Sequence, residues 1–399
     1  MLEQIVITTA TRTALGSLGG SLKEVQPEVL AKEMIDSVLK KAGLDRDAVD
    51  MVIFGQTKQS CDAPNIARVA ALMAELPEST AAYTVHMQCA SGLQAIVDAA
   101  LQINAGYAEA VIAGGVESMS TAPYYLRKGR YGYGAGNGEL LDPNTESQPK
   151  SQPEDLYGHF TMGMTAENLA ERYSISREDQ DAFALESQRR AIDAIDSGRF
   201  REEITPVMVK KKRELVSFDT DEFPHRDTSM EKLSKLKPAF KPGGSVTAGN
   251  SSGRNDGCSA VLVSSLVKAE ELGLKPLVRV VAAGAAGVDP RYMGFGPVPS
   301  IRKALSRAGL TLADIGLIEL NEAFAAQSLS VIRELGLNTD IVNVNGGAIA
   351  LGHPLGCSGN RISVTLIHEM MRRGVRYGLA SLCVAGGQGL TVIYENMCL

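Results

Sequence analysis

The chain has 399 residues, a formal net charge of −6, and 44% hydrophobic and 22% charged residues, which are ordinary values for a globular protein. This length allows two core-forming units, and the composition excludes a disordered or collagen-like chain. The negative charge gives no overall attraction to nucleic acid or to anionic membranes.

The sequence also bears on the compartment of the protein. No window approaches the ~20 uninterrupted apolar residues of a membrane helix, and the start Met1-Leu2-Glu3 lacks the basic beginning of a secretion signal. The six cysteines form no CxxC pair and have no histidines at zinc-finger spacing. They predict free thiols in a reducing, cytoplasmic compartment, with no disulfide framework and no metal site.

The first part of the chain alternates predicted strands and helices. The predicted strands are Gln4–Ala10, Met51–Gly55, Ala81–Val85 and Ala110–Gly115. A helix is expected over Leu30–Ala42, ending at Gly43, and another begins at about Ser91. This alternation predicts an α/β fold with a mainly parallel sheet.

Cys89 lies between the predicted strand Ala81–Val85 and the helix that begins at about Ser91. Unpaired N–H groups and the positive end of the helix dipole favour a thiolate there, so we expect a lowered pKa and a nucleophilic sulfur. The alternative is a small buried apolar residue without chemistry. Partners elsewhere in the chain distinguish the two interpretations.

From about Ser120 to Gly249 the pattern changes to polar, proline-bearing stretches and a helical run over Thr165–Ala194. This stretch predicts an inserted loop domain. Its basic run 210–213 is interpreted as a solvated turn between strands in preference to a phosphate site. The strand pattern resumes at Cys258–Leu266.

From Pro276 the order of elements recurs, which predicts a duplicated α/β domain. Ile315–Leu320 corresponds to Met51–Gly55, and Ser358–Val364 corresponds to the start of the Ser91 helix. Related loops are expected to face each other across a pseudo-twofold axis. The predicted domains are 1–119 plus 250–270 for the first half, 120–249 for the inserted loop domain, and 271–399 for the second half.

The loops of the second half carry the side chains that Cys89 needs as partners. His353 lies in a glycine-rich turn, Cys383 lies near the end of a predicted strand, and Asn321 follows another. Ligands of open α/β sheets bind beyond the carboxyl ends of the strands, where all three residues fall. We therefore expect these residues to form one site with Cys89.

At these residues the chain resembles the thiolase family of acetyl-CoA acetyltransferases and 3-ketoacyl-CoA thiolases, nearly from end to end. The matching stretches are Arg12-Thr13 with Gly16, Cys89-Ala90-Ser91-Gly92-Leu93, Gly115-Val116-Glu117-Ser118-Met119-Ser120, Asn321-Glu322-Ala323-Phe324, Gly352-His353-Pro354 and Cys383. The resemblance implies duplicated thiolase-like α/β domains in a layered α-β-α-β-α core.

The resemblance also implies ping-pong Claisen chemistry on coenzyme A thioesters, without a tightly bound cofactor. Cys89 would carry the acyl group, His353 would activate it, and Cys383 would remove the α-proton of acetyl-CoA. Asn321 would hold a water that, with His353, stabilises the enolate oxygen. The backbone N–H groups of Cys89 and Ala385 would bind the tetrahedral oxyanion.

Further residues are implied to contact the substrate. Ser252 would bond the pantetheine amide, and Met162, Met293 and Phe324 would line the acyl and pantetheine pocket. The family also implies a homo-oligomer, either a dimer or a dimer of dimers.

Three positions depart from the family pattern. His86 replaces the usual asparagine three residues before the nucleophile, so the support of the Cys89 turn is expected to differ. Ala385 replaces a glycine, which would strain the backbone if that residue needs φ > 0. Thr161 replaces a histidine of many acetyl-specific members, with His159 two residues earlier.

The sequence therefore predicts a thiolase, with acetyl-CoA C-acetyltransferase favoured over a 3-ketoacyl-CoA thiolase for longer or unusual acyl chains. A condensing enzyme fed by acyl carrier protein is disfavoured because such enzymes would lack Cys383. An inactive CoA- or lipid-binding member is disfavoured because all four reactive positions are filled.

Overall fold

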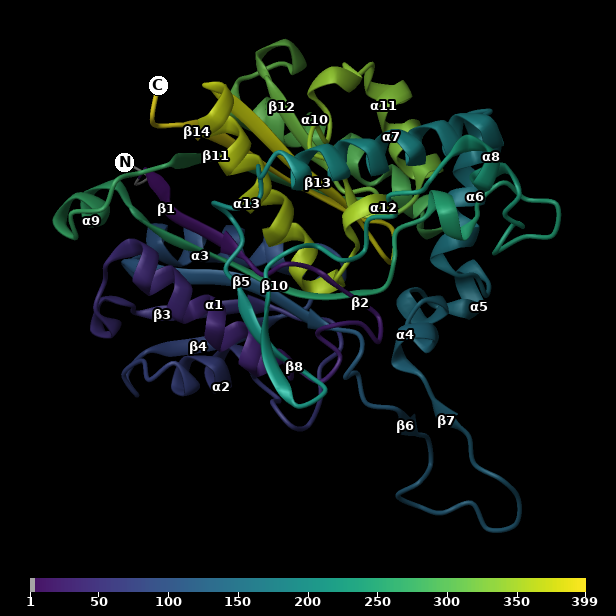
Figure 1. Ribbon diagram of the computed structural model, residues 1–399, viewed down its shortest axis with the longest axis horizontal. Coiled ribbons are helices and arrows are strands. Elements are labelled where there is room, and N and C mark those ends of the chain that lie inside the picture. The colour runs from purple at the N-terminus through teal and green to yellow at the C-terminus, as the bar shows by residue number, and fades with distance from the viewer. Residues whose placement is uncertain (1–3) are drawn as a thin grey trace.

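The computed structural model describes residues 4–399, so the start Met1-Leu2-Glu3 lies outside the described residues. Strands from the two halves of the chain form one central sheet (Figure 1). The first half contributes β1 Ile5–Arg12, β2 Gly16–Ser17, β3 Met51–Gly55, β4 Ala81–Val85, β5 Ala110–Ser118 and β10 Asn255–Ser265. The second half contributes β11 Val278–Gly287, β12 Leu317–Leu320, β13 Tyr377–Val384 and β14 Gln388–Asn396.

The strand order is the same in both halves, which confirms the predicted duplication. It runs β4-β3-β5-β10-β1 in the first half and β12-β13-β14-β11 in the second. In the first half, β4 pairs in parallel with β3 at the edge of the sheet. In the second half the corresponding position beside β12 holds a single parallel bridge, between Ile318 and Val342. The halves are joined where Val6 pairs with Arg279 and Ile7 pairs with Val278, antiparallel.

The prediction of a mainly parallel sheet is wrong, because the sheet is mixed. Among the described strands, β3–β4, β3–β5 and β12–β13 pair in parallel, whereas β1, β10, β11 and β14 pair antiparallel with their neighbours. The helices α2 Ile66–Met73 and α3 Ser91–Asn104 carry the chain back between β3, β4 and β5, which makes those strands parallel. The alternation of elements in the sequence does not reveal that β10 returns in the opposite direction.

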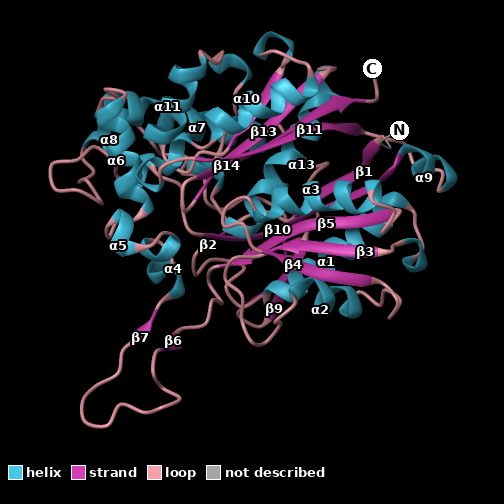
Figure 2. Ribbon diagram, turned by 180° about the vertical axis from the view of Figure 1, so that it is seen from behind, coloured by secondary structure: helices cyan, strands magenta, loops and turns pink. Residues whose placement is uncertain are grey.

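Helices cover both sheet halves outside and fill the space between them, as Figure 2 shows. The outer helices are α1 Pro27–Ala42 and α2 on the first half, and α10 Pro297–Ala308 and α11 Ala325–Leu335 on the second. The central layer is α3 with α13 Leu355–Arg373, which pack on both sheet halves. The five layers agree with the predicted α-β-α-β-α core.

The strands alternate between the two faces that these helices cover. On β5, Ile112 packs into the outer core with α1, whereas Val111 and Ala113 pack into the central core with α3 and α13. This period of two arises because successive side chains of a strand point to opposite faces. The helix α1 ends as predicted, with Gly43 in the left-handed conformation at φ 67°.

The central helices approach each other closely at two glycines. A Cβ atom on Gly92 would lie 2.7 Å from the carbonyl oxygen of Gly356, and one on Gly359 would lie 2.6 Å from the backbone nitrogen of Leu93. The two glycines belong to the Ser-Gly pairs that the sequence matched between the halves. Glycine is required at both positions because a side chain would push the helices apart.

The chain between β5 and β10 contains its own short elements. They are β6 Tyr125–Leu126, β7 Leu140–Leu141, α4 Pro143–Glu146, α5 Glu154–Tyr157, α6 Met162–Arg172, α7 Arg177–Asp196, β8 Val207–Lys211, β9 Glu214–Phe218 and α8 Met230–Ser234. The single helical run predicted over Thr165–Ala194 is two helices, separated at Ser174, whose φ is +48°. The basic run lies at the exposed turn of the β8–β9 hairpin, as expected.

Arg12, the last residue of β1, connects this strand to the inserted chain through two buried ion pairs. Its guanidinium is fully buried, donates to the Glu203 carboxylate at 2.6 Å, and donates twice to Asp221 at 2.8 and 2.9 Å. Such bidentate pairs fix geometry as well as charge. In the described part of the chain, no helix is long and apolar enough to span a membrane.

We expect Gly359→Ala to lower the free energy of unfolding by roughly 1–3 kcal/mol, because the added methyl group meets the backbone of α3. Gly287→Ala is the matched control, since a Cβ there has only the Gly387 oxygen, 3.9 Å away, within 4 Å. Urea unfolding of both variants measures the difference. Equal stability of the two variants would show that α3 and α13 separate at little cost.

Candidate active site

A pocket of about 180 Å³ opens where both halves meet the chain between β5 and β10. The first half supplies Gln88 and Cys89, and the second half supplies Met293, Ala323, Phe324, His353, Leu355, Cys383 and Ala385. The chain between β5 and β10 supplies Met119, Asn144, Ser147, Gln148, Ser151, Met162, Phe240, Ser251, Ser252, Gly253 and Arg254. Eight of the nine predicted site residues therefore line one pocket, and Asn321 lies directly behind it.

Cys89 lies on a tight turn between β4 and α3, as the sequence predicted. The preceding residue, Gln88, has a backbone φ of +46°, a value that residues other than glycine rarely adopt. The Ser91 hydroxyl donates to the carbonyl oxygen of Gln88 at 2.6 Å and accepts from the backbone N–H of Met87 at 2.8 Å. Ser91 holds the turn, whereas His86 is exposed.

The predicted lowering of the Cys89 pKa is wrong. Burial raises the pKa of this thiol to about 11, although backbone N–H groups of Ala385 and Cys89 and the positive charge of Lys58 act in the opposite direction. The start of α3 is enclosed by the second half of the chain, so the loss of water outweighs the helix dipole. The resting residue is therefore a neutral thiol.

His353 is held in one orientation by two hydrogen bonds. Its Nδ1 lies 2.6 Å from the Ser358 hydroxyl, which donates to the carbonyl oxygen of Pro354 at 2.9 Å. Because that hydroxyl proton is already used, Nδ1 carries the ring proton and donates to Ser358. The unprotonated Nε2 then lies 3.4 Å from the Asn321 amide nitrogen, Nδ2.

The imidazole of His353 is neutral. Burial and, secondarily, the positive charge of Arg361 lower its pKa to about 3. The preceding residue must be glycine, because Gly352 has a φ of +105° and a Cβ there would lie 2.3 Å from the Asn255 side chain. That asparagine accepts the backbone N–H of His353 at 2.9 Å.

Asn321 and Cys383 come from neighbouring strands of the second half. The backbone N–H of Asn321 donates to the Ser381 carbonyl at 2.9 Å, which aligns the ends of β12 and β13. The Oδ1 atom of Asn321 is buried without a protein partner among the described residues. Burial, and then the nearby Cys89, raise the pKa of the Cys383 thiol well above its usual value.

The backbone strain that a positive φ would cause at Ala385 is absent. Its φ is not positive, and the left-handed conformations of this turn are carried by Gly386 and Gly387, at φ 88° and 82°. Ala385 therefore presents its backbone N–H to the Cys89 sulfur without conformational cost. The alanine is compatible with the turn because the glycine-requiring positions follow it.

The four predicted substrate-binding residues form one side of the pocket. Phe324 packs edge-on against Phe240, with ring centroids 5.9 Å apart, and Met162 and Met293 join the same cluster. The backbone N–H of Ser252 donates to the Ala323 carbonyl at 3.0 Å. Among the described residues, Thr161 and His159 stay outside the lining, and His159 pairs with Glu154 on the surface.

The sequence analysis missed a polar side of the pocket. It is formed by Gln88, Asn144, Ser147, Gln148, Ser151 and Arg254. The available signal was the i, i+3, i+4, i+7 spacing of four of these residues, which places them on one helical face.

The duplicated core and the enclosed thiols define a class of α/β enzyme whose chemistry passes through cysteine. Family models described as the thiolase N-terminal domain and the thiolase C-terminal domain match residues 5–266 and 274–396. The chain belongs to the thiolase family.

Individual relatives agree with this assignment. A Pseudomonas aeruginosa acetyl-CoA acetyltransferase is 50% identical, with 98% of this chain and 99% of that protein covered. The crystal structure of the Bacillus anthracis acetyl-CoA acetyltransferase matches with a TM-score of 0.96 and 48% identity over 99% of both chains. Human mitochondrial 3-ketoacyl-CoA thiolase in complex with CoA matches with a TM-score of 0.94 and 42% identity over 99% of this chain and 98% of that one.

The lowered pKa of His353 predicts acid sensitivity. The imidazole of His353 takes up a proton near pH 6.5 in the unfolded state but only near pH 3 in the folded state. The free energy of unfolding therefore falls as the pH drops through this window. Between pH 7 and pH 5 the loss from His353 alone is about 2 kcal/mol.

We expect His353→Gln to reduce the pH dependence of the unfolding free energy by this amount. Exposed His86→Gln serves as the control and should keep the wild-type slope. Urea unfolding at pH 7 and pH 5 measures both. A wild-type slope in the His353 variant would mean that the imidazole is charged in the folded protein.

Proposed function

We propose that the protein is a CoA-dependent acyltransferase of the thiolase type, specifically an acetyl-CoA C-acetyltransferase that interconverts two acetyl-CoA with acetoacetyl-CoA and CoA. The observation that carries this proposal is the pocket in which Cys89, neutral His353 and Cys383 meet. The acetyltransferases among the relatives support the choice of acetyl-CoA.

The first half-reaction needs a thiolate that the resting enzyme does not hold. The free Nε2 of His353 accepts the proton of Cys89, and the thiolate attacks the thioester carbonyl of an acyl-CoA. The backbone N–H groups of Cys89 and Ala385 then stabilise the tetrahedral oxyanion, a role worth about 3 kcal/mol per donor. Cys383 gives its proton to the departing CoA, the acyl group stays on Cys89, and Nε2 of His353 keeps the proton that it took from Cys89.

The second half-reaction needs a base for a carbon acid. Cys383, left as a thiolate when CoA departs, takes the α-proton of acetyl-CoA, and its raised pKa makes this thiolate a strong base. His353 and a water held by Asn321 stabilise the enolate oxygen, and the unpartnered Oδ1 of Asn321 supports that role. The enolate carbon attacks the acyl group, and the released Cys89 thiolate takes its proton back from His353.

Ser252, Met162, Met293 and Phe324 bind the pantetheine arm and the acyl group in this proposal, and coenzyme A thioesters are substrates without a resident cofactor. We retain the boundaries 1–119 plus 250–270, 120–249 and 271–399 for the three domains, and a cytoplasmic location.

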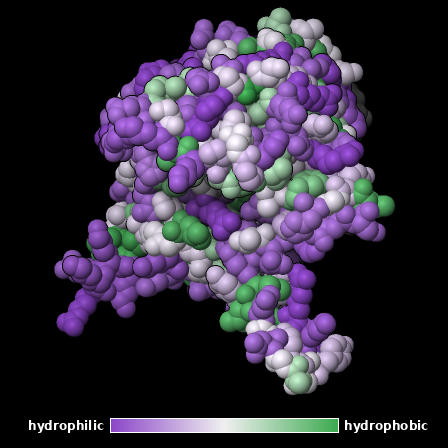
Figure 3. Space-filling view, turned by 90° about the vertical axis from the view of Figure 1, so that its right-hand side faces the viewer, coloured by the Kyte–Doolittle hydropathy of each residue, from purple (hydrophilic) through white to green (hydrophobic). Residues whose placement is uncertain are grey.

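The protein is further proposed to be a homo-oligomer. The hairpin that carries β6 and β7 projects from the body (Figure 1). Its exposed apolar side chains include Tyr131 and Leu140, and Figure 3 shows hydrophobic residues on the projecting lower part of the surface. Burial of these side chains by a second copy would remove them from water. A dimer of dimers accommodates such a contact.

A 3-ketoacyl-CoA thiolase for longer acyl chains is the second candidate. The resemblance to acetyl-specific thiolases implies a histidine where this chain has Thr161, and the human mitochondrial 3-ketoacyl-CoA thiolase has the same fold. Thiolysis assays from acetoacetyl-CoA upward decide between the two candidates. Absence of cleavage at every length would reject both.

The roles of the two cysteines are separable. We expect Cys383→Ala to form an acyl-enzyme from acetyl-CoA but to lose condensation and to stop exchanging the methyl protons of acetyl-CoA with deuterated water. Cys89→Ala should show no covalent acyl group but residual exchange. Intact-protein mass spectrometry and proton NMR measure the two properties, and the reverse pattern would exchange the assigned roles.

Ala385→Gly tests the unstrained turn. Because Ala385 has no positive φ, replacing it by glycine relieves no backbone strain. We therefore expect kcat to stay within about twofold of the wild type. Steady-state thiolysis of acetoacetyl-CoA measures it. A tenfold rise would show that the alanine misplaces the oxyanion donor.

A further inference from the structure

One side of the pocket is polar over its whole length. Asn144, Ser147, Gln148 and Ser151 follow one another at helical spacing along α4 and the short turn Pro149–Ser151, so they share one face, and all four line the pocket. Apolar side chains at such positions would have continued the surface formed by Phe324 and the methionines. This helical face therefore lies in the pocket without serving an apolar core.

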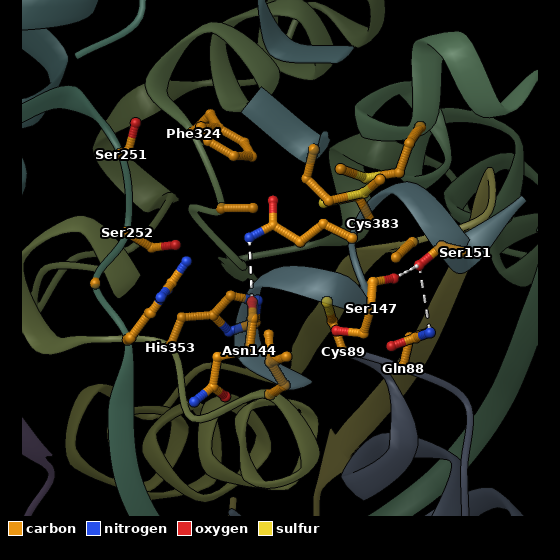
Figure 4. Close-up of a pocket in the computed structure, with 18 of the residues that line it drawn as sticks. Gln88, Cys89, Asn144, Ser147, Ser151, Ser251, Ser252, Phe324, His353 and Cys383 are labelled. Carbon is orange, nitrogen blue, oxygen red and sulfur yellow. Dashed lines mark hydrogen bonds between the residues drawn. The ribbon is translucent and has the colours of Figure 1, made fainter. Parts of the chain in front are cut away.

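The polar side begins at the nucleophile itself. Gln88, the residue before Cys89, has a left-handed backbone and its Nε2 lies 3.5 Å from the Ser151 hydroxyl. In Figure 4, Gln88, Ser147 and Ser151 lie on the same side of the pocket as Cys89, whereas Ser251 and Phe324 lie on the other side. An acyl group carried by Cys89 would therefore lie near the polar side of the pocket.

Two positively charged side chains, Lys58 and Arg254, lie next to the polar face. Lys58 is buried and its Nζ donates to the Ser147 hydroxyl at 2.6 Å and to the Pro143 carbonyl at 3.2 Å. Because the Ser147 oxygen accepts this bond, its own proton is free to be donated into the pocket. The charge of Lys58 thus reaches the pocket surface through a hydroxyl donor.

Arg254 adds a second positive charge to the lining. Within residues 4–399 its guanidinium has only long contacts, 3.5 Å to the Thr145 hydroxyl and 3.9 Å to the Asp142 carboxylate. Asp142 already accepts the backbone N–H of Asn144 at 2.8 Å, as the cap of α4. Arg254 therefore keeps donors for a further acceptor.

We propose that this polar side binds a terminal carboxylate of the acyl chain, so that the enzyme prefers 3-oxoacyl-CoA substrates that end in a carboxylate. The inference rests on the proposed thiolase function and, within it, selects the second candidate, a thiolase for acyl chains longer than acetyl. Arg254 and the Ser147 hydroxyl are the donors to the carboxylate, since charged donors prefer an anionic acceptor. The phosphates of CoA lie at the far end of the pantetheine arm from the carbonyl that meets Cys89.

Thiolysis of such a substrate follows the chemistry already described. The Cys89 thiolate attacks the C3 carbonyl, the bond between C2 and C3 breaks, and C2 takes a proton from Cys383 to leave as acetyl-CoA. The thiol of a second CoA then takes over the shortened acyl group, and its proton returns the enzyme to its starting state. The terminal carboxylate stays unchanged throughout.

The test compares 3-oxoadipyl-CoA with 3-oxohexanoyl-CoA, which have the same chain length and differ in the terminal carboxylate. We expect kcat/KM to favour the diacid substrate by tenfold or more. Arg254→Met should reduce this ratio about tenfold, and Ser147→Ala should reduce it about threefold, as one lost charged contact and one lost hydroxyl donor predict.

The control variant is Arg189→Met, which removes an exposed arginine that pairs with Glu186 and Asp193 on α7. It should leave the ratio unchanged and reports any general effect of net charge on CoA substrates. Thermal unfolding checks that each variant is folded, which we expect for Arg254 because its side chain is 40% exposed.

Two outcomes would overturn the inference while leaving the thiolase function intact. One is equal kcat/KM for the two six-carbon substrates in an enzyme that cleaves acetoacetyl-CoA. The other is an Arg254→Met variant whose KM rises equally for all three thioesters, which would assign Arg254 to CoA itself. An enzyme that cleaves none of the three rejects the proposed function together with its substrate class.

Discussion

The close contact of α3 and α13 is the constraint on which the rest of the structure depends. Gly92 and Gly359 let the two helices meet backbone to backbone, and each helix begins in a loop of the pocket. Cys89 precedes α3 and His353 precedes α13, so the helix contact sets the relative position of the two side chains. Glu117 reinforces it, because its buried carboxylate accepts the N–H groups of Lys58 and of Gly356 at 2.9 and 2.8 Å.

Enclosure by the two halves also sets the electrostatics of the site. Burial raises the pKa of Cys89 and lowers that of His353, so both residues rest in their neutral forms. A neutral pair avoids holding an ion pair in a dry pocket, which would cost several kcal/mol for each ion. The same enclosure makes the backbone N–H of Ala385 a stronger stabiliser of charge that develops during a reaction.

The pocket has two chemically different sides because different parts of the chain build them. The methionines and aromatic rings come from α6, the turn before α10 and the loop before α11, and they continue a hydrophobic cluster. The hydroxyl and amide groups come from the short helical stretch after the β6–β7 hairpin, which has no core of its own. The inserted chain can therefore change substrate preference while the central helices keep the reacting groups in place.

The sequence by itself determined the duplication, the α/β class and the residues that gather at the pocket, because apolar runs and glycine-bearing motifs recur locally in the chain. It placed Cys89 before a helix, His353 in a glycine-rich turn, and Cys383 and Asn321 at strand ends. The strand directions, the raised pKa of Cys89 and the unstrained φ of Ala385 were decided only by the tertiary structure. Each depends on what distant segments do: β10 chooses its direction after a long excursion, desolvation needs the second half to close over Cys89, and Gly386 and Gly387 take up the turn that the alanine avoids.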